Sequence, residues 1–224
     1  MEWSPALTKQ QWNELEAILL DMDGTLLDLA FDNDFWLRQV PRLYAEKLGI
    51  DPEMAQQQLF DLYHEYKGTL QWYCTDFWSE QLGIDIIKHK FDFAHNIALR
   101  PGTVEFLNKA KTHNKRLVLV TNAHPDTLAV KMDHVLIAKY FDDIYSSHQF
   151  SRPKESPEFW ARLQQEIDVS LEKCLFVDDS EEILTVAQQS GVKLVLSVSQ
   201  PDLSLPAKDG MKFPSINQLN EIIG

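Results

Sequence analysis

Ala17-Ile18-Leu19-Leu20-Asp21-Met22-Asp23-Gly24-Thr25 carries the strongest indication of the fold in this chain. Its first four residues form a short apolar run, which is typical of a buried strand in a parallel sheet. The run ends in the carboxylates Asp21 and Asp23, and open α/β sheets keep their chemistry at the carboxyl ends of such strands. Gly24 allows the chain to turn and a ligand to approach the backbone. The stretch therefore predicts a nucleophilic carboxylate with an acid/base carboxylate beside it.

The composition is that of an ordinary globular protein. The chain has 224 residues, 44% apolar and 25% charged, which suffices for one sizeable core and a smaller insert. The net charge of −13 and the lack of a basic stripe argue against a nucleic-acid partner. Cys74 and Cys174 lack metal-ligand spacing, and we expect Cys174 to be a small core residue in a reducing compartment. With no apolar run near the roughly 20 residues that span a bilayer and no secretory signal, we expect a cytoplasmic protein with no membrane partner.

Short apolar runs alternate with amphipathic segments along most of the chain. After 17–20, the predicted strands are Arg116–Thr121, Ile144–Ser146, Cys174–Asp178 and Lys193–Ser197. The amphipathic segments lie near 102–113, 125–139, 156–167 and 181–190. Such alternation predicts an α/β fold in which a doubly wound parallel sheet has helices on both faces.

The block 28–99 differs from the rest because its apolar residues recur only at helical spacing. We therefore predict a helical insert at 28–99 between two parts of one catalytic core, 1–27 and 100–224. The turn residues Arg100-Pro101-Gly102 mark the return to the core. Near the end of the chain, Ser215 is expected to cap a short closing helix whose inward side chains are Leu219, Ile222 and Ile223.

Polar residues stand at the end of each of the central predicted strands. They are Asp21 and Asp23 after the first, Thr121 and Asn122 after the second, and Asp178, Asp179 and Ser180 after the fourth. The carboxyl ends of parallel strands line one crevice, so these groups should converge, with Lys154 added from a loop. Unpaired carboxylates about 4 Å apart repel by several kcal/mol at an intermediate dielectric. Mg²⁺, which prefers oxygen ligands, would remove that repulsion and attract a phosphate.

Together these groups predict phosphoryl transfer, in which positioning and charge stabilisation do most of the catalysis. Asp21 would attack phosphorus and form an aspartyl-phosphate. Asp23 would protonate the leaving oxygen and then take a proton from the attacking water. Lys154, Thr121 and Asn122 would bind the phosphate oxygens.

The ordered set Asp21-x-Asp23-Gly24-Thr25, Thr121-Asn122, Lys154 and Val177-Asp178-Asp179-Ser180 resembles the four motifs of the haloacid dehalogenase superfamily of phosphohydrolases. The resemblance implies that Mg²⁺ is held by the Asp21 carboxylate, the Asp23 backbone carbonyl and Asp179, with Asp178 acting directly or through a water. It also implies that the insert is a mobile α-helical cap. One departure is that the family usually has Lys followed by Pro, whereas this chain has Pro153-Lys154-Glu155.

Further stretches, some of them in the insert, resemble the bacterial GMP/IMP 5′-nucleotidases of that superfamily. They are Leu20–Asn33, Trp72-Tyr73-Cys74, Trp78–Gly83 and Thr121–Pro125. This resemblance implies a small phosphorylated metabolite, a purine nucleoside monophosphate, as the substrate.

Four other functions stay open. A sugar-phosphate phosphatase or a phosphomutase of the same superfamily would use the same groups. A phospho-acceptor signalling domain also combines paired acids, Thr and Lys on a doubly wound sheet, but lacks the second Asp and a large insert. A catalytically idle binding module would be expected to lack one of the catalytic groups.

Several residues near the predicted crevice are left with two interpretations. His124 is either a substrate contact or structural, and Lys131 is expected on a solvated helix face rather than in the crevice. The aromatic residues of the insert are expected mostly in its core, with positions 31–36 and 72–73 as the candidates for stacking on a base. Asp32 and Asn33 are expected to face the site.

Overall fold

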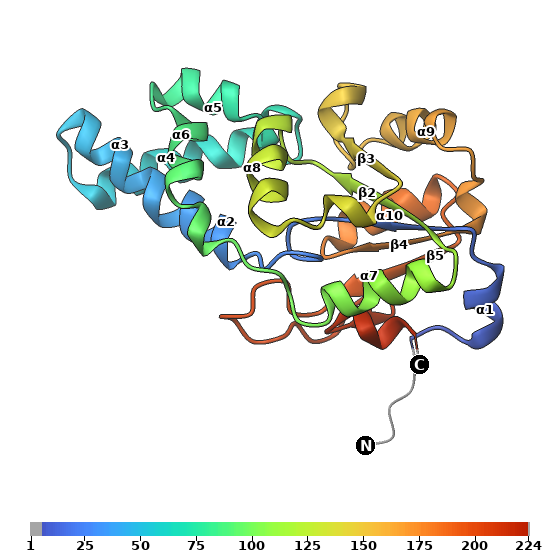
Figure 1. The fold of residues 1–224 in the computed structure, drawn as a ribbon. Helices are drawn as coiled ribbons and strands as arrows, with labels where there is room; N and C mark the ends of the chain where they lie inside the picture. The colour runs from blue at the N-terminus through green and yellow to red at the C-terminus, as the bar shows by residue number, and fades with distance from the viewer. Residues whose placement is uncertain (1–5, 224) are drawn as a thin grey trace.

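The computed structural model describes residues 6–223, and its centre is a single six-stranded sheet (Figure 1). All neighbouring strands run parallel in the order β3-β2-β1-β4-β5-β6. The strands are β1 (Ala17–Leu20), β2 (Arg116–Thr121), β3 (Asp143–Ser146), β4 (Cys174–Asp178), β5 (Leu194–Val198) and β6 (Ser215–Ile216). The predicted doubly wound parallel sheet is confirmed, and β1 lies where the strand order reverses.

Helices cover both faces of this sheet because the strand residues are apolar on both sides. Ile18 and Leu20 of β1 face a core built with α1 (Lys9–Glu14), α7 (Thr103–Thr112) and α8 (Pro125–Val135). Ala17 and Leu19 face the opposite core, which α9 (Pro157–Glu166) and α10 (Glu181–Gln189) complete. Cys174 is fully buried in this second core, as expected from its strand.

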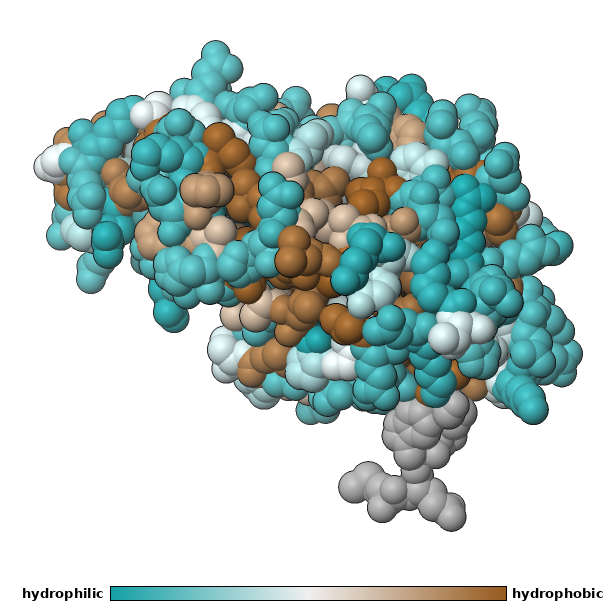
Figure 2. All heavy atoms as spheres, viewed as in Figure 1, coloured by the Kyte–Doolittle hydropathy of each residue, from teal (hydrophilic) through white to brown (hydrophobic). Residues whose placement is uncertain are grey.

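The segment between β1 and α7 is mainly helical and has its own apolar core. Its helices are α2 (Ala30–Asp34), α3 (Val40–Leu48), α4 (Pro52–Tyr66), α5 (Thr75–Leu82) and α6 (Ile86–Asp92). The two chain connections to the sheet lie side by side, since the Asp28 backbone N–H donates to the Ala98 carbonyl at 2.9 Å. Figure 1 shows these helices as a lobe beside the sheet. Figure 2 shows hydrophobic side chains gathered on one face where this lobe meets α8.

A π-helical turn at Phe35–Gln39 joins α2 to α3 inside the predicted helical stretch. Pro41 explains the turn, because its ring has no N–H to donate to the Leu37 carbonyl and would clash with it in a regular α-helix. The Gln56 side-chain amide donates to that carbonyl instead, at 3.2 Å. The widened turn presents Trp36 and Leu37 to the cavity described below.

The end of the chain differs from the prediction. Ser215 does not cap a helix but lies in β6, which extends the sheet beyond β5, and the Ser199 backbone N–H donates to the Ile216 carbonyl at 2.9 Å. A 3₁₀ turn, Leu219–Ile222, follows, and the Glu221 side chain accepts the Gln218 backbone N–H at 2.8 Å. The expected inward residues Leu219, Ile222 and Ile223 are buried. Over residues 6–223, the helices are too short or too polar to cross a membrane.

Candidate active site

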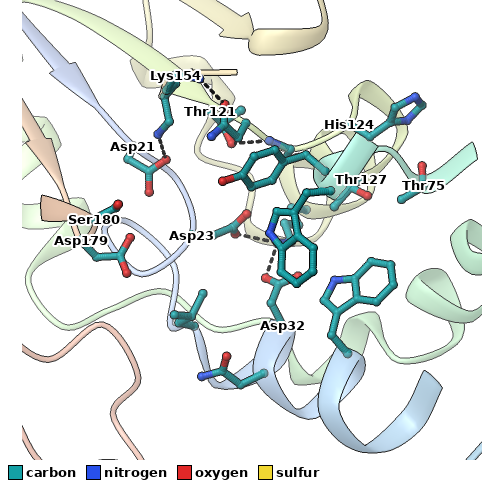
Figure 3. Close-up of a pocket in the computed structure, with 18 of the residues that line it drawn as sticks. Asp21, Asp23, Asp32, Thr75, Thr121, His124, Thr127, Lys154, Asp179 and Ser180 are labelled. Carbon is teal, nitrogen blue, oxygen red and sulfur yellow. Dashed lines mark hydrogen bonds and ion pairs between the residues drawn. The ribbon is translucent and has the colours of Figure 1, made fainter. Parts of the chain in front are cut away.

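The polar residues predicted at the strand ends converge on one cavity of about 590 Å³ between the sheet and the helical lobe (Figure 3). β2 and β4 flank β1, so Thr121 and Asp178 lie on either side of Asp21. The cavity is lined from the sheet side by Asp21, Asp23, Thr121, Asn122, Lys154, Asp178, Asp179 and Ser180. Its volume lies in the range typical of small-molecule sites.

Lys154 is the buried cation at the centre of this cluster. Its Nζ donates to Asp21 Oδ1 at 2.5 Å and to Asp178 Oδ2 at 2.7 Å, and only 1% of the residue is exposed. The Lys154 carbonyl accepts a bond from the Trp160 indole at 2.8 Å, which fixes the loop. Burial raises the pKa of Asp21 to about 7; Lys154 opposes the rise and Asp178 adds to it. The reversed order of Pro153 and Lys154 therefore still brings the lysine to the nucleophile candidate.

Asn122 holds the Lys154 loop in place. Its Oδ1 accepts the Lys154 backbone N–H at 2.9 Å, and its Nδ2 donates to Glu155 Oε2 at 3.0 Å. The side-chain amide is thus engaged within the protein, and its contact with phosphate stays a prediction. Thr121 is buried at the end of β2 and its Oγ1 accepts the Ala123 backbone N–H at 3.0 Å, which leaves its hydroxyl hydrogen for a ligand.

The carboxylates Asp21, Asp178 and Asp179 provide a donor set that fits a hard divalent cation. One oxygen from each lies within 4.8 Å of the others. Burial raises the pKa of Asp179 well above its usual range, and repulsion from Asp178 and Asp21 adds to the rise. A cation would relieve that repulsion. Gly24, with φ +84°, packs against Asp179 so closely that a Cβ would lie 2.8 Å from its Cγ. Only glycine lets the loop after β1 approach this carboxylate.

Asp178 is the least available of the three acids. Its Oδ2 accepts from Lys154 and its Oδ1 accepts the Ser180 backbone N–H at 2.8 Å. With both oxygens bonded within the protein, a contact to a cation through a water is the arrangement that we favour for Asp178.

Lys131 was expected on a solvated helix face, and the structure shows that this expectation is wrong. Only 1% of it is exposed, and its Nζ donates to Asp23 Oδ1 at 2.6 Å and to Asp32 Oδ2 at 2.5 Å. Asp32 Oδ1 in turn accepts from Lys90 Nζ at 2.8 Å. Four charged side chains are therefore linked in a row, from Lys90 of α6 through Asp32 of α2 and Lys131 of α8 to Asp23, the candidate acid/base. Sequence reasoning missed it because nothing local distinguishes Lys131 or Lys90 from solvated lysines.

The surroundings of Asp23 suit a group that exchanges protons near neutral pH. Burial raises its pKa to about 6, against the lowering effect of Lys131 and with a further rise from Asp32 and Asp21. A pKa in this range is what general acid and base catalysis requires.

The helical lobe supplies the other wall of the cavity. Its lining includes the expected Asp32 and Asn33 together with three partly exposed aromatic residues, Trp36, Trp72 and Tyr73. Asp32 is held by the two lysines, and Asn33 donates to Asp202 at 2.7 Å. Phe35 and Trp78 are buried in the core of the lobe, as expected for most of its aromatic residues.

The fold and the site together define a class of hydrolase. The family model of haloacid dehalogenase-like hydrolases matches residues 15–191. The chain belongs to this family, which confirms the resemblance carried by its four motifs.

Individual relatives agree with this assignment. The chain is 41% identical over 212 residues to the GMP/IMP nucleotidase YrfG of Escherichia coli, covering 95% of this chain and 96% of that protein. Its fold is similar to that of a HAD phosphatase from Thermococcus onnurineus, with a TM-score of 0.77, 20% identity, and coverage of 93% and 96% of the two chains. It is also similar to CbbY from Rhodobacter sphaeroides in complex with phosphate, with a TM-score of 0.66, 19% identity, and coverage of 93% and 96%.

Proposed function

We propose that this protein is a Mg²⁺-dependent phosphomonoesterase that hydrolyses purine 5′-nucleotides through an aspartyl-phosphate on Asp21. The observation that carries the proposal is the position of Asp21. Its carboxylate opens into the cavity beside two other acids and accepts from a buried lysine. A buried carboxylate in that setting is positioned to act as a nucleophile toward a phosphate ester.

Mg²⁺ held by Asp21 and Asp179, with Asp178 and the Asp23 backbone carbonyl as further partners, would neutralise charge on the phosphate. In the first half-reaction, an Asp21 oxygen forms a bond to phosphorus while the ester P–O bond breaks and Asp23 gives its proton to the leaving oxygen. In the second, Asp23 takes a proton from water, whose oxygen attacks phosphorus and releases Asp21. Lys154 balances negative charge during both steps.

The aromatic wall supports a nucleotide rather than a sugar phosphate. Trp36, Trp72 and Tyr73 face the same cavity as the acids, so a ligand with its phosphate at Asp21 would place its remaining atoms against flat apolar side chains. Stacking on such rings favours a planar base. The nucleotidase relative, which is similar over 95% of this chain, adds to that support.

The test is a phosphate-release screen over purine and pyrimidine 5′-monophosphates and hexose phosphates, with Mg²⁺ present. We expect the highest kcat/KM with GMP or IMP and no turnover by Asp21→Asn. Asp209→Asn, a change at an exposed carboxylate, is the matched control and should keep full activity. A preference for hexose phosphates would overturn the nucleotide assignment, and isomer formation from a bisphosphorylated sugar would indicate a mutase.

A further inference from the structure

A second group of potential metal ligands lies at the junction of the lobe and the sheet. It consists of Cys74, His124 and His148, whose ligand atoms all lie within 4.8 Å of one another. Cys74 precedes α5, His124 precedes α8, and His148 lies in the short 3₁₀ turn Ser147–Phe150 after β3. The two imidazole rings meet edge to face with centroids 4.8 Å apart. Three elements distant in sequence thus bring one sulfur and two imidazoles together.

The ring of His148 has an unused polar atom here. Its Nε2 is buried and has no hydrogen-bond partner among the described residues. A buried polar atom without a partner is unfavourable, and this nitrogen is therefore available to bind a ligand. A neutral imidazole is the form that binds a metal.

Cys74 and His124 complete a donor set of defined chemistry. The Cys74 Sγ accepts the Phe77 backbone N–H at 3.4 Å, and the same donor would support the thiolate that a metal requires. Sulfur and imidazole ligands select Zn²⁺ and related transition metals, whereas Mg²⁺ prefers oxygen. Small rotations of the three side chains would place each ligand atom about 2.0–2.3 Å from a Zn²⁺ ion bound between them.

We propose that Cys74, His124 and His148 form a transition-metal site, for Zn²⁺ in the first instance, separate from the acidic site of Asp21. A water or the exposed Asp76 carboxylate, whose Oδ2 lies 3.7 Å from His124 Nε2, can take the fourth position. The spacing of the cysteines in the sequence did not indicate this site, because its ligands come from three separate elements.

The position of the site gives it a mechanical consequence. Cys74 belongs to the helical lobe and both histidines belong to the sheet part, so a bound metal would join the two. Figure 3 draws His124 on the side of the cavity away from Asp21 and Asp179. A metal there would leave the acids free and hold the lobe against the sheet, which slows product release where opening limits turnover.

The test uses the full chain, stripped of metal by a chelator and kept reduced, and titrated with CoCl₂ while its absorption spectrum is recorded. We expect one equivalent of Co²⁺ to produce the intense visible bands of a tetrahedral ion and a thiolate-to-cobalt charge-transfer band. Zn²⁺ should abolish both. The acidic site has only oxygen ligands and contributes no charge-transfer band, so the readout is specific to Cys74 and independent of the proposed nucleotidase activity.

Matched variants show which side chains bind the metal. Cys74→Ser should abolish the charge-transfer band, and His124→Gln and His148→Gln should each weaken binding of Co²⁺ at least about 10-fold. His134→Gln, an exposed histidine at the end of α8, should bind like the wild type. Circular dichroism and melting curves show that each variant is folded. Absence of the band from the wild type, its persistence in Cys74→Ser, or equal weakening in His134→Gln would overturn the proposal.

Discussion

Lys154 and Lys131, two of the buried lysines that line the site, differ in the parts of the molecule that they join. Among residues 6–223, Lys154 Nζ bonds within the sheet part, to Asp21 and Asp178 at the ends of β1 and β4 and to the Val120 carbonyl of β2. Lys131 contacts Asp23 of the sheet part and Asp32 at the root of the helical lobe. Asp32 is also held by Lys90, which comes from α6 inside the lobe.

The surroundings of Asp21 and Asp23 therefore differ in whether they include residues of the lobe. The groups bonded around Asp21, which are Lys154 and Asp178, belong to the sheet part. The surroundings of Asp23 are complete only when α2 and α6 lie against α8. We infer that the nucleophile is set by the sheet alone, whereas the acid/base is set by the position of the lobe.

The largest effect is expected at Lys154. Lys154→Met should lower kcat for GMP by about 10³-fold, because it removes the cation that balances charge at Asp21. It should also lower the melting temperature in the absence of Mg²⁺, since buried Asp21 and Asp178 lose their partner. Lys193→Met, at an exposed lysine beside β5, is the control. Activity within a few-fold of the wild type would remove Lys154 from the mechanism.

Asp23→Asn should come next, and its effect should depend on the leaving group. A nucleoside is a poor leaving group and needs a proton, so kcat for GMP should fall by about 10²-fold. p-Nitrophenolate leaves without a proton, and the loss with p-nitrophenyl phosphate should be much smaller. Initial rates with both substrates measure the difference. Equal losses would contradict the acid role of Asp23.

Variants of Lys131 and Lys90 test whether the contacts with the lobe position Asp23. Lys131→Met should reduce kcat for GMP by about 10–100-fold, since a misplaced acid transfers its proton poorly, and the loss should shrink with p-nitrophenyl phosphate. Lys90→Met should reduce kcat less, because Lys90 contacts Asp32 and not Asp23 itself. Lys131→Arg keeps the charge and should recover part of the rate.

The control for this pair is Lys139→Met, at an exposed lysine that follows α8. If Lys131→Met lowered the rates with both substrates equally, Lys131 would be a structural residue and not one that positions Asp23. If Lys90→Met had no effect at all, the acid/base would not depend on the lobe.

The smallest effect concerns stability and pH. The pKa values of Asp21 and Asp23 are raised to about 7 and about 6, so the native protein without metal binds protons that the unfolded chain has released. The metal-free protein should therefore lose stability as the pH rises from about 4 to about 7. Mg²⁺ binding opposes this loss. Melting temperatures with EDTA and with Mg²⁺ should converge near pH 5 and separate toward pH 8, and a gap that narrows with rising pH would contradict the assignment.

The sheet and its polar strand ends were predictable because their signals are local. A short apolar run such as Ala17–Leu20 predicts a buried strand, and parallel pairing then places Asp21, Thr121 and Asp178 at one edge whatever else the chain does. Lys154 could be identified only because no other lysine lies between Lys139 and Lys173, since the order Pro153-Lys154 departs from the family pattern.

The contacts of the lobe were not predictable in the same way. Burial of Lys131 depends on how α8 packs against α2, which no spacing along α8 reports. The π-helical turn at Phe35–Gln39 had a local signal in Pro41, but the direction in which it turns Trp36 is a tertiary property. The strand at Ser215 formed because β5 offered a free edge. A serine that precedes the apolar residues Leu219, Ile222 and Ile223 resembles a helix cap equally well.

We expect the phosphoryl group to be transferred to Asp21 before it is released to water. The experiment is rapid quenching of the enzyme during turnover of GMP, followed by borohydride reduction and peptide mass spectrometry. Because an acyl phosphate is reduced to an alcohol, homoserine should be found at position 21 and unchanged aspartate at position 23. Homoserine elsewhere, or none while phosphate is released at the full rate, would show that Asp21 is not the nucleophile.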